Sequence, residues 1–173
     1  MTTLVAPAHA PDGSIAVGTF SVAMGQMAVA GGGAMLRAVG LGSCVAIVLL
    51  APQQRLAAMA HCMLPHRESD DAVSPKFVAC AVPALQALLA DTGATVPLAA
   101  VLVGGASMFP GVPADIVRDI AGNNVAAARS ALAVAGIPIR VEDVGGHVGR
   151  SVLVDPVTQR VMVRTMRGGD RWL

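Results

Sequence analysis

The feature that most constrains the fold is a nearly continuous apolar stretch, residues 38–51, that is too short to cross a membrane. A membrane-spanning helix needs about 20 apolar residues, and this stretch also contains Gly40, Gly42 and Ser43. Its content of Val, Leu and Ile is typical of a buried strand. We therefore expect an aliphatic β-sheet core and no membrane insertion, although 54% of the residues are hydrophobic.

The charge and the aromatic content argue against one large class of function. The chain carries 12 Lys and Arg against 11 Asp and Glu, a formal net charge of +1, so no broad basic face is available for phosphate contacts. Aromatic residues make up only 2% of the sequence, which leaves few rings to stack on bases. We expect no nucleic-acid partner.

The cysteines and the N-terminal residues indicate the compartment. Cys44, Cys62 and Cys80 are an odd number and form no CxxC pair, so neither a disulfide framework nor a metal site is predicted. Residues 1–14 lack a basic segment followed by an apolar one, and they show no periodicity. We interpret them as a flexible leader, not a signal peptide, and expect a cytoplasmic protein.

Apolar runs and turn signals predict more strands than helices, joined mainly by hairpins. This pattern favours an α+β fold with mostly antiparallel sheets over a doubly wound parallel sheet. One domain is expected over residues 15–166, followed by a basic tail at 167–173. Helices are expected over about 75–91, with Pro83 as an interior flaw, and over 123–135. Strands are expected at 21–30 (weak), 35–50, 56–64, 98–103, 137–141, 150–154 and 160–166.

Two of the predicted strands form a hairpin that brings a thiol and an imidazole together. If the chain reverses between Pro52 and Gln53, Cys44 lies directly opposite His61, with Cβ atoms about 4.5–5.5 Å apart. An imidazole at that separation can accept the thiol proton and raise the thiolate population. A slip of one residue would put the two side chains on opposite faces. The alternative is that Cys44 is an ordinary core thiol.

Glycines at the predicted strand ends supply backbone N–H groups that no side chain covers. Acyl chemistry at Cys44 would need such donors, because negative charge develops on the carbonyl oxygen of the tetrahedral intermediate. Tight turns alone would also account for these glycines. The candidate substrate or oxyanion residues are Gly42, Ser43, Gly104, Gly105 and Ser107.

Four blocks carry the most specific signal: GLGSCVA at 40–46, AMAHCMLP at 58–65, GGASMF at 104–109 and DVGGHVGR at 143–150. In this order they resemble the chemoreceptor glutamine deamidase family, CheD. The similarity covers roughly residues 15–166, nearly the whole predicted domain. It implies a three-layer α/β/β sandwich with two main helices.

The resemblance also implies a chemistry. Family members are cysteine hydrolases that convert glutamine side chains on the cytoplasmic helices of chemoreceptors to glutamate and release ammonia. Cys44 would attack the carboxamide carbon, His61 would shuttle the proton, and no cofactor would be required. Some members bind a CheC-type phosphatase, which would be a second partner.

The chain departs from the family pattern at positions that matter for activity. A Thr six residues before the cysteine completes the family's catalytic set, and here that position is Ala38. A backbone carbonyl or Ser43 could orient the imidazole instead. The alternative interpretation is a catalytically weakened or inactive CheD-like binding module. A generic amidase for small substrates, a third alternative, would need a deep closed pocket.

Overall fold

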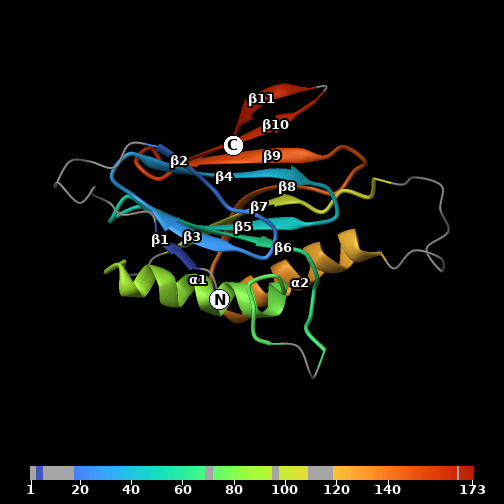
Figure 1. Cartoon of the computed structure of the whole chain (residues 1–173), viewed down its shortest axis with the longest axis horizontal. Coiled ribbons are helices and arrows are strands. Elements are labelled where there is room, and N and C mark those ends of the chain that lie inside the picture. Colours follow the sequence, from blue (N-terminus) through green and yellow to red (C-terminus); the bar gives the residue numbers. More distant parts are fainter. Residues whose placement is uncertain (1–2, 6–17, 69–71, 95–97, 109–118, 167) are drawn as a thin grey trace.

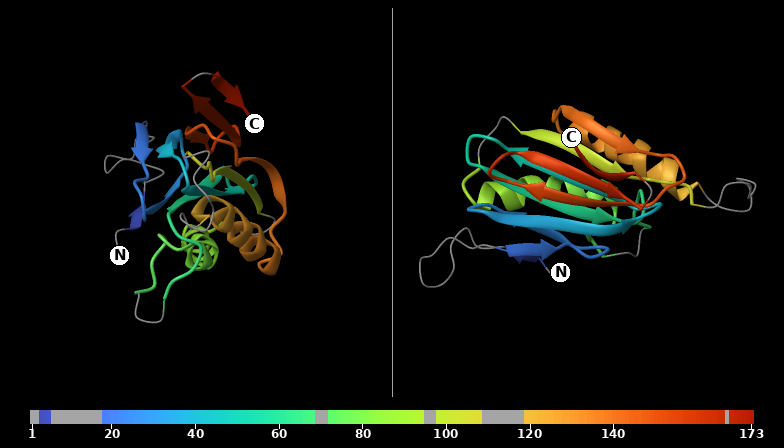
Figure 2. Two further views of the ribbon diagram at one scale, coloured as in Figure 1. Left: turned by 90° about the vertical axis from the view of Figure 1, so that its right-hand side faces the viewer. Right: turned by 90° about the horizontal axis from the view of Figure 1, so that it is seen from above.

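In the part of the chain that the structure describes, two helices, a six-stranded inner sheet and a five-stranded outer sheet are stacked in three layers (Figure 1). The structure is a computed structural model, and it describes residues 3–5, 18–68, 72–94, 98–108, 119–166 and 168–173. The helices cover one face of the inner sheet and the outer sheet covers the other (Figure 2). The predicted α+β class and the α/β/β layering are confirmed.

The inner sheet lies in the middle of the sandwich. In spatial order it consists of β1 (Thr3–Val5), β3 (Met27–Ala30), β6 (Leu56–Cys62), β5 (Val45–Ala51), β7 (Ala99–Gly104) and β8 (Ile139–Val144). β1 is parallel to β3 and β7 to β8, whereas the other neighbours are antiparallel. Its two central strands, β5 and β6, are almost entirely buried.

The outer sheet covers the face of the inner sheet that the helices leave open. In spatial order it consists of β11 (Gly169–Trp172), β10 (Arg160–Thr165), β9 (Arg150–Asp155), β4 (Ala34–Leu41) and β2 (Gly18–Ser21). β2 and β4 are parallel, and the remaining neighbours are antiparallel.

The apolar stretch predicted as one strand over residues 35–50 is divided between the two sheets. Its first half is β4 of the outer sheet and its second half is β5 of the inner sheet. β4 ends at Leu41, next to Gly40, whose φ of 71° is a conformation that favours glycine. Residues 42–44 then cross between the layers. The prediction of one strand was wrong because both halves have the same aliphatic composition. The weak candidate at 21–30 likewise contributes the end of β2 and all of β3, in different sheets.

The helices α1 (Val78–Asp91) and α2 (Ile120–Val134) pack against each other and against the inner sheet. α1 begins later than predicted, with Phe77 rather than Ser74 at the N-cap position, and Pro83 remains inside it. α2 begins earlier than predicted, because the Asp119 side chain caps it by accepting a hydrogen bond of 2.9 Å from the Gly122 amide. No helix of the described residues is long and apolar enough to cross a bilayer.

Side chains on β5 and β6 alternate between two apolar layers. Ile47 and Leu49 point to the helices, in what we call the helix-side layer. Val48, Leu50 and Met59 point to the outer sheet, in what we call the inter-sheet layer. The inner sheet is therefore covered on both faces, which explains the continuous apolar sequence of its central strands.

Both ends of the chain contribute strands that the sequence analysis did not predict. Within the expected leader, β1 pairs with β3. Within the expected tail, β11 pairs with β10, and the Arg160 guanidinium lies 4.5 Å from the centroid of the Trp172 ring. The Leu173 amide donates to the Val161 carbonyl at 2.7 Å, and its side chain packs against the inter-sheet layer. The C-terminal residues thus belong to the outer sheet.

Candidate functional site

Cys44 and His61 lie at the open end of the β5–β6 hairpin, on the face that the outer sheet covers. His61 is two residues after Met59 on β6, so its side chain points into the same inter-sheet layer. Cys44 lies one residue before β5 and packs against that layer as well. The structure therefore places a thiol and an imidazole on one face of the inner sheet.

The register of the hairpin differs from the predicted one. His61 lies opposite Ala46, not opposite Cys44, because the turn between Ala51 and Leu56 has four residues where the prediction assumed two. The ladder ends at the pair Val45–Cys62, so Cys44 lies one residue beyond it. If this register continued for one more residue, Cys44 would be a diagonal neighbour of His61, and such neighbours lie about 7–8 Å apart between backbones. The shift is by two residues, so the shared face is preserved.

The imidazole of His61 is held in one tautomer by a main-chain group. Its Nδ1 lies 3.3 Å from the Val22 carbonyl oxygen. A carbonyl can only accept, so Nδ1 carries the hydrogen and, in the neutral ring, the lone pair is on Nε2. Among the described residues, Nε2 is buried without a hydrogen-bond partner. The ring therefore presents a free basic nitrogen within the inter-sheet layer.

Burial keeps both groups neutral at rest. It lowers the pKa of His61, an effect that the Val22 carbonyl partly offsets. It also raises the pKa of the Cys44 thiol, partly offset by the residue's own backbone amide. The resting pair is therefore a thiol with a neutral imidazole, which suits proton transfer during attack on a substrate better than a preformed thiolate.

Exposure distinguishes the three thiols. Cys44 is half-buried, whereas Cys62, the residue after His61, is fully buried in the helix-side layer. Burial raises the pKa of Cys62 far above its usual range. Cys80 lies near the start of α1, away from the inter-sheet layer. Of Cys44 and Cys62, the two thiols at this end of the hairpin, only Cys44 is accessible to a molecule from solvent.

Ala38 lies on β4, opposite Val152 of β9, with its methyl group buried in the inter-sheet layer. It is thus in the layer that contains His61, and it offers no hydroxyl. His61 Nδ1 instead donates its hydrogen bond to the Val22 carbonyl. Residue types do not indicate Val22, because a main-chain acceptor has no signature in the sequence.

Several of the predicted oxyanion donors are already engaged. The amides of Gly42, Gly105 and Ser107 donate to the carbonyls of Gly40, Cys44 and Gly146, at 2.9, 2.8 and 2.8 Å. In this arrangement they have no N–H group to offer a substrate. Of these predicted residues, Ser43 remains a candidate.

Gly104 has a packing role beside Cys44. Its φ is 116°, and a Cβ there would lie 2.3 Å from the Cys44 carbonyl oxygen. Only glycine lets the end of β7 approach the Cys44 segment this closely. The predicted site glycine therefore fixes the main chain of Cys44, which is a different task from binding an oxyanion.

Asn124 is a site residue that the sequence analysis placed only at the start of a helix. It is completely buried on α2, and its Nδ2 group donates to the Ser43 carbonyl at 2.9 Å and to the Met63 carbonyl at 3.0 Å. The available signal was a polar residue between Ala121, Val125 and Ala128 on the buried face of the helix.

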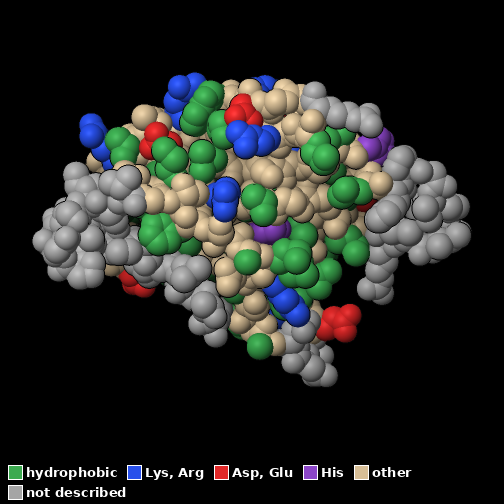
Figure 3. All heavy atoms as spheres, turned by 45° about the horizontal axis from the view of Figure 1, so that its top comes forward, with side chains coloured by type: hydrophobic (Ala, Val, Ile, Leu, Met, Phe, Trp, Pro, Cys, Tyr) green, Lys and Arg blue, Asp and Glu red, His purple; other side chains and the backbone are tan. Residues whose placement is uncertain are grey.

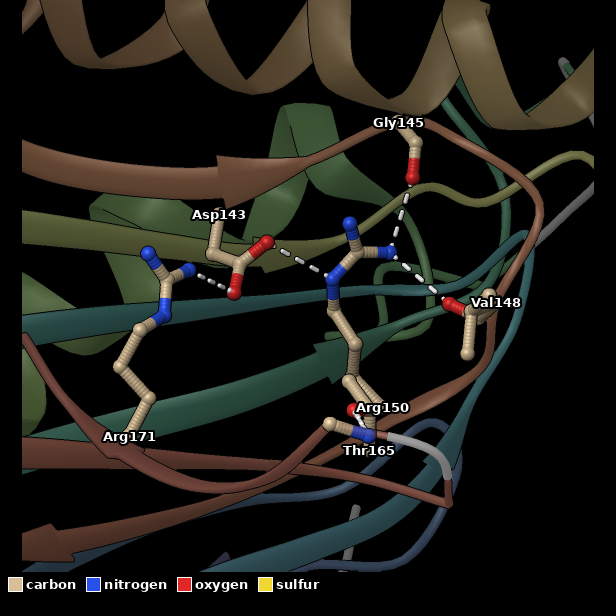
Figure 4. Close-up of polar contacts among 7 residues, drawn as sticks. Asp143, Gly145, Val148, Arg150, Thr165 and Arg171 are labelled. Carbon is tan, nitrogen blue, oxygen red and sulfur yellow. Dashed lines mark hydrogen bonds and ion pairs between the residues drawn. The ribbon is translucent and has the colours of Figure 1, made fainter.

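An ion-pair network braces the loop beside the site. Figure 4 shows the Arg150 guanidinium between the Asp143 carboxylate and the carbonyls of Gly145 and Val148, at 2.9, 2.8 and 3.0 Å. Arg171 of β11 reaches the other oxygen of Asp143 at 2.6 Å. β11 is thereby connected to the end of β8, and through Asp143 and Arg150 to the β8–β9 loop.

That loop holds a second segment against Cys44. The Ser107 amide donates to the Gly146 carbonyl, and His147 Nδ1 donates to the Ser107 carbonyl, both at 2.8 Å. The adjoining Met108 side chain lies so close to Gly42 that a Cβ there would be 2.6 Å from its sulfur. The position of Met108 near the Cys44 segment thus depends on the braced loop.

A cavity of about 560 Å³ opens next to Met108 and reaches across the outer sheet to β10 and β11. Met108, Val148 and Met166 border it with exposed apolar side chains. On the side of the outer sheet, hydrophobic side chains are interspersed with those of Lys and Arg (Figure 3). Exposed apolar side chains around a hollow are typical of a surface that receives another protein.

A half-buried thiol and a basic imidazole on an α/β/β sandwich define a candidate thiol-dependent hydrolase. Comparison with known proteins shows which family the chain belongs to. The family described as CheD chemotactic sensory transduction matches residues 63–165. A protein of Archaeoglobus fulgidus named probable chemoreceptor glutamine deamidase CheD is 37% identical over 88% of this chain and 96% of its own.

Two further relatives extend the match. One from Geobacter metallireducens, probable chemoreceptor glutamine deamidase CheD 2, is 40% identical over 85% of this chain and 93% of its own. One from Thermotoga maritima, chemoreceptor glutamine deamidase CheD, is 35% identical over 87% of this chain and 94% of its own. The chain belongs to the CheD family, as its sequence blocks predicted.

Proposed function

We propose that this chain is a cysteine-dependent protein-glutamine deamidase, which converts glutamine side chains on the cytoplasmic helices of chemoreceptors to glutamate. The observation that carries the proposal is the free, basic Nε2 of His61 on the same face as the half-buried Cys44. The names of the relatives, which are chemoreceptor glutamine deamidases, supply the substrate class.

The first half of the reaction forms a thioester. Cys44 Sγ attacks the carboxamide carbon while His61 Nε2 accepts the thiol proton. The C–N bond of the tetrahedral intermediate then breaks, and the imidazolium gives its proton to the nitrogen, which leaves as ammonia. The Val22 carbonyl stabilises the ring while it is charged.

The second half releases the product. His61 Nε2 takes a proton from a water molecule, whose oxygen attacks the thioester carbon. The C–S bond breaks, the sulfur recovers its proton from the imidazolium, and the glutamine side chain has become a carboxylic acid. No redox step or cofactor is needed, because every proton and bond is accounted for by Cys44, His61 and water.

The surroundings of the site suit a protein substrate. The cavity bordered by Met108, Val148 and Met166 lies next to the Cys44 segment. Exposed apolar side chains at its edge give another protein a surface to pack on while one of that protein's glutamine side chains reaches Cys44. A CheC-type phosphatase as a second partner stays a prediction.

The test is the mass of a receptor cytoplasmic fragment after incubation with the protein. We expect a gain of about one mass unit for each converted glutamine and no gain with Cys44→Ala. Wild-type protein that leaves receptor fragments from the same cell unchanged would contradict the proposal.

A second candidate function is a CheD-like binding module with little or no turnover. It is favoured by one observation, the buried methyl group of Ala38 where the family has a catalytic hydroxyl. Under that interpretation the wild-type protein binds the receptor fragment without changing its mass. The experiment above therefore separates the two functions.

A further inference from the structure

Asn124 connects the two chain segments that carry Cys44 and His61. Its side-chain amide is completely buried, and both of its N–H groups are used, one on the Ser43 carbonyl and one on the Met63 carbonyl. Because carbonyl oxygens can only accept, these contacts also fix which end of the amide is nitrogen.

The two carbonyls lie where the β5–β6 ladder stops. The last backbone pair of that ladder is Val45 with Cys62. Ser43 directly precedes Cys44, and Met63 lies two residues after His61. Asn124 therefore bridges the hairpin at the point where its own hydrogen bonds no longer hold the two segments together.

The oxygen of the same amide differs from its nitrogen. Among the described residues, Asn124 Oδ1 is buried without a hydrogen-bond partner. A buried acceptor without a partner destabilises the folded protein, and an aliphatic side chain of similar size would avoid that cost. The contribution of the residue therefore lies in its two donated hydrogen bonds.

We propose that Asn124 is a positioning residue, which sets the distance between the Cys44 sulfur and the His61 imidazole by fixing both segments from α2. The inference rests on the proposed function, because it assumes that the thiol and the imidazole act as a pair. Asn124 itself touches no reacting atom in the proposed mechanism. Its effect passes through the main chain of residues 43 and 63.

The test is a double-mutant cycle on the alkylation rate of Cys44, measured with iodoacetamide on the folded protein and read by peptide mapping. The four proteins are wild type, His61→Gln, Asn124→Ala and the double variant. We expect His61→Gln to slow alkylation roughly tenfold in the wild type, because the imidazole accepts the thiol proton as the sulfur attacks. In the Asn124→Ala background the same change should slow alkylation less than about twofold, because the pair is no longer aligned.

Two further variants complete the design. Asn123→Ala is the matched control, since Asn123 is the exposed neighbour on the same turn of α2, and it should leave the full effect of His61→Gln intact. Asn124→Ser keeps one donor and should give an intermediate coupling. It also serves as the test variant if Asn124→Ala fails to fold.

The outcomes are distinct. If His61→Gln slows alkylation equally in the wild type and in the Asn124 variants, the positioning role is overturned while the paired site stands. If His61→Gln has no effect in the wild type, there is no pair to position, and both the inference and the proposed function fail. The inference is supported if the effect of His61→Gln on alkylation disappears with Asn124→Ala, returns in part with Asn124→Ser and is unchanged with Asn123→Ala.

Discussion

The two faces of the inner sheet are built from the same strands and yet differ in chemistry. On the helix-side layer β5 and β6 present only apolar side chains, and the thiol of Cys62 is completely buried among them. On the inter-sheet layer the neighbouring residue His61 has a free ring nitrogen, and Cys44 reaches solvent. Strand alternation along β6 thus puts Cys62 and His61 on opposite faces of the inner sheet.

The difference follows from what covers each face at the open end of the hairpin. On the helix side, α1 and α2 cover Cys62 completely. On the other side, the chain crosses from β4 to β5 through residues 42–44, so the covering layer is interrupted beside Cys44. A site can form where the chain changes sheets, because the backbone there is not fully paired.

The largest expected effect separates the two thiols. Cys44→Ala should reduce deamidation by about 10³-fold or more, because it removes the nucleophile. Cys62→Ala should leave the rate within about twofold of wild type and lower the stability of the fold by roughly 1 kcal/mol, since it only removes buried contact. Initial rates and thermal unfolding of both variants check this. Equal losses of activity in the two variants would contradict the assignment of Cys44 as the nucleophile and Cys62 as a structural thiol.

The next effect concerns the imidazole. His61→Gln should lower the deamidation rate about 10²- to 10⁴-fold, the usual range for loss of a general base. A matched change on the other face, Ala60→Ser, should leave the rate within about threefold, because Ala60 points into the helix-side layer. Rates of both folded variants with the same receptor fragment provide the measurement. A His61→Gln variant with full activity would remove His61 from the mechanism.

The pH dependence of stability should report the buried imidazole. The pKa of His61 is lowered in the folded protein, so below about pH 6.5 the unfolded chain binds a proton that the folded chain does not. His61 therefore lowers the stability as the pH falls from there toward its folded pKa. His61→Gln should flatten this part of the profile, measured by chemical denaturation between about pH 5 and 8. An unchanged slope in the His61→Gln variant would mean that burial does not lower the pKa of the imidazole.

The smallest effect on activity is expected from restoring the family hydroxyl. Because the Val22 carbonyl already holds Nδ1, Ala38→Thr should change the rate by less than about threefold. It should also destabilise the fold by about 1–3 kcal/mol through overpacking of a buried site. Rates and unfolding midpoints of this variant are the measurement. A large gain in rate would show that the chain lacks a needed third group, in favour of the weakened binding module.

The sequence predicted the layers better than the connections between them. Aliphatic runs located most strands of both sheets, and the four sequence blocks identified the family and its α/β/β layering. The crossing at residues 42–44 was missed, because nothing in composition distinguishes β4 from β5. The register was two residues off, since the turn length between Ala51 and Leu56 is set by tertiary packing rather than by Pro52 alone.

Within the site, residue types revealed the reacting side chains but not their supports. Cys44 and His61 stood out because thiol and imidazole are chemically distinctive. Val22 acts through its carbonyl, and the engaged amides of Gly42 and Gly105 depend on partners far along the chain or on local bends. Asn124 could have been identified as a polar residue on the buried face of α2. It was missed because it was interpreted only as part of a helix start.

The most direct test of the Cys44–His61 site is the deamidation rate that remains as Cys44 is alkylated. Samples would be taken during slow modification by iodoacetamide, the modified fraction of each thiol mapped, and the rate measured with a receptor fragment. We predict that activity falls in proportion to modified Cys44 while Cys62 stays unmodified. Full activity in a sample whose Cys44 is completely alkylated would contradict the account.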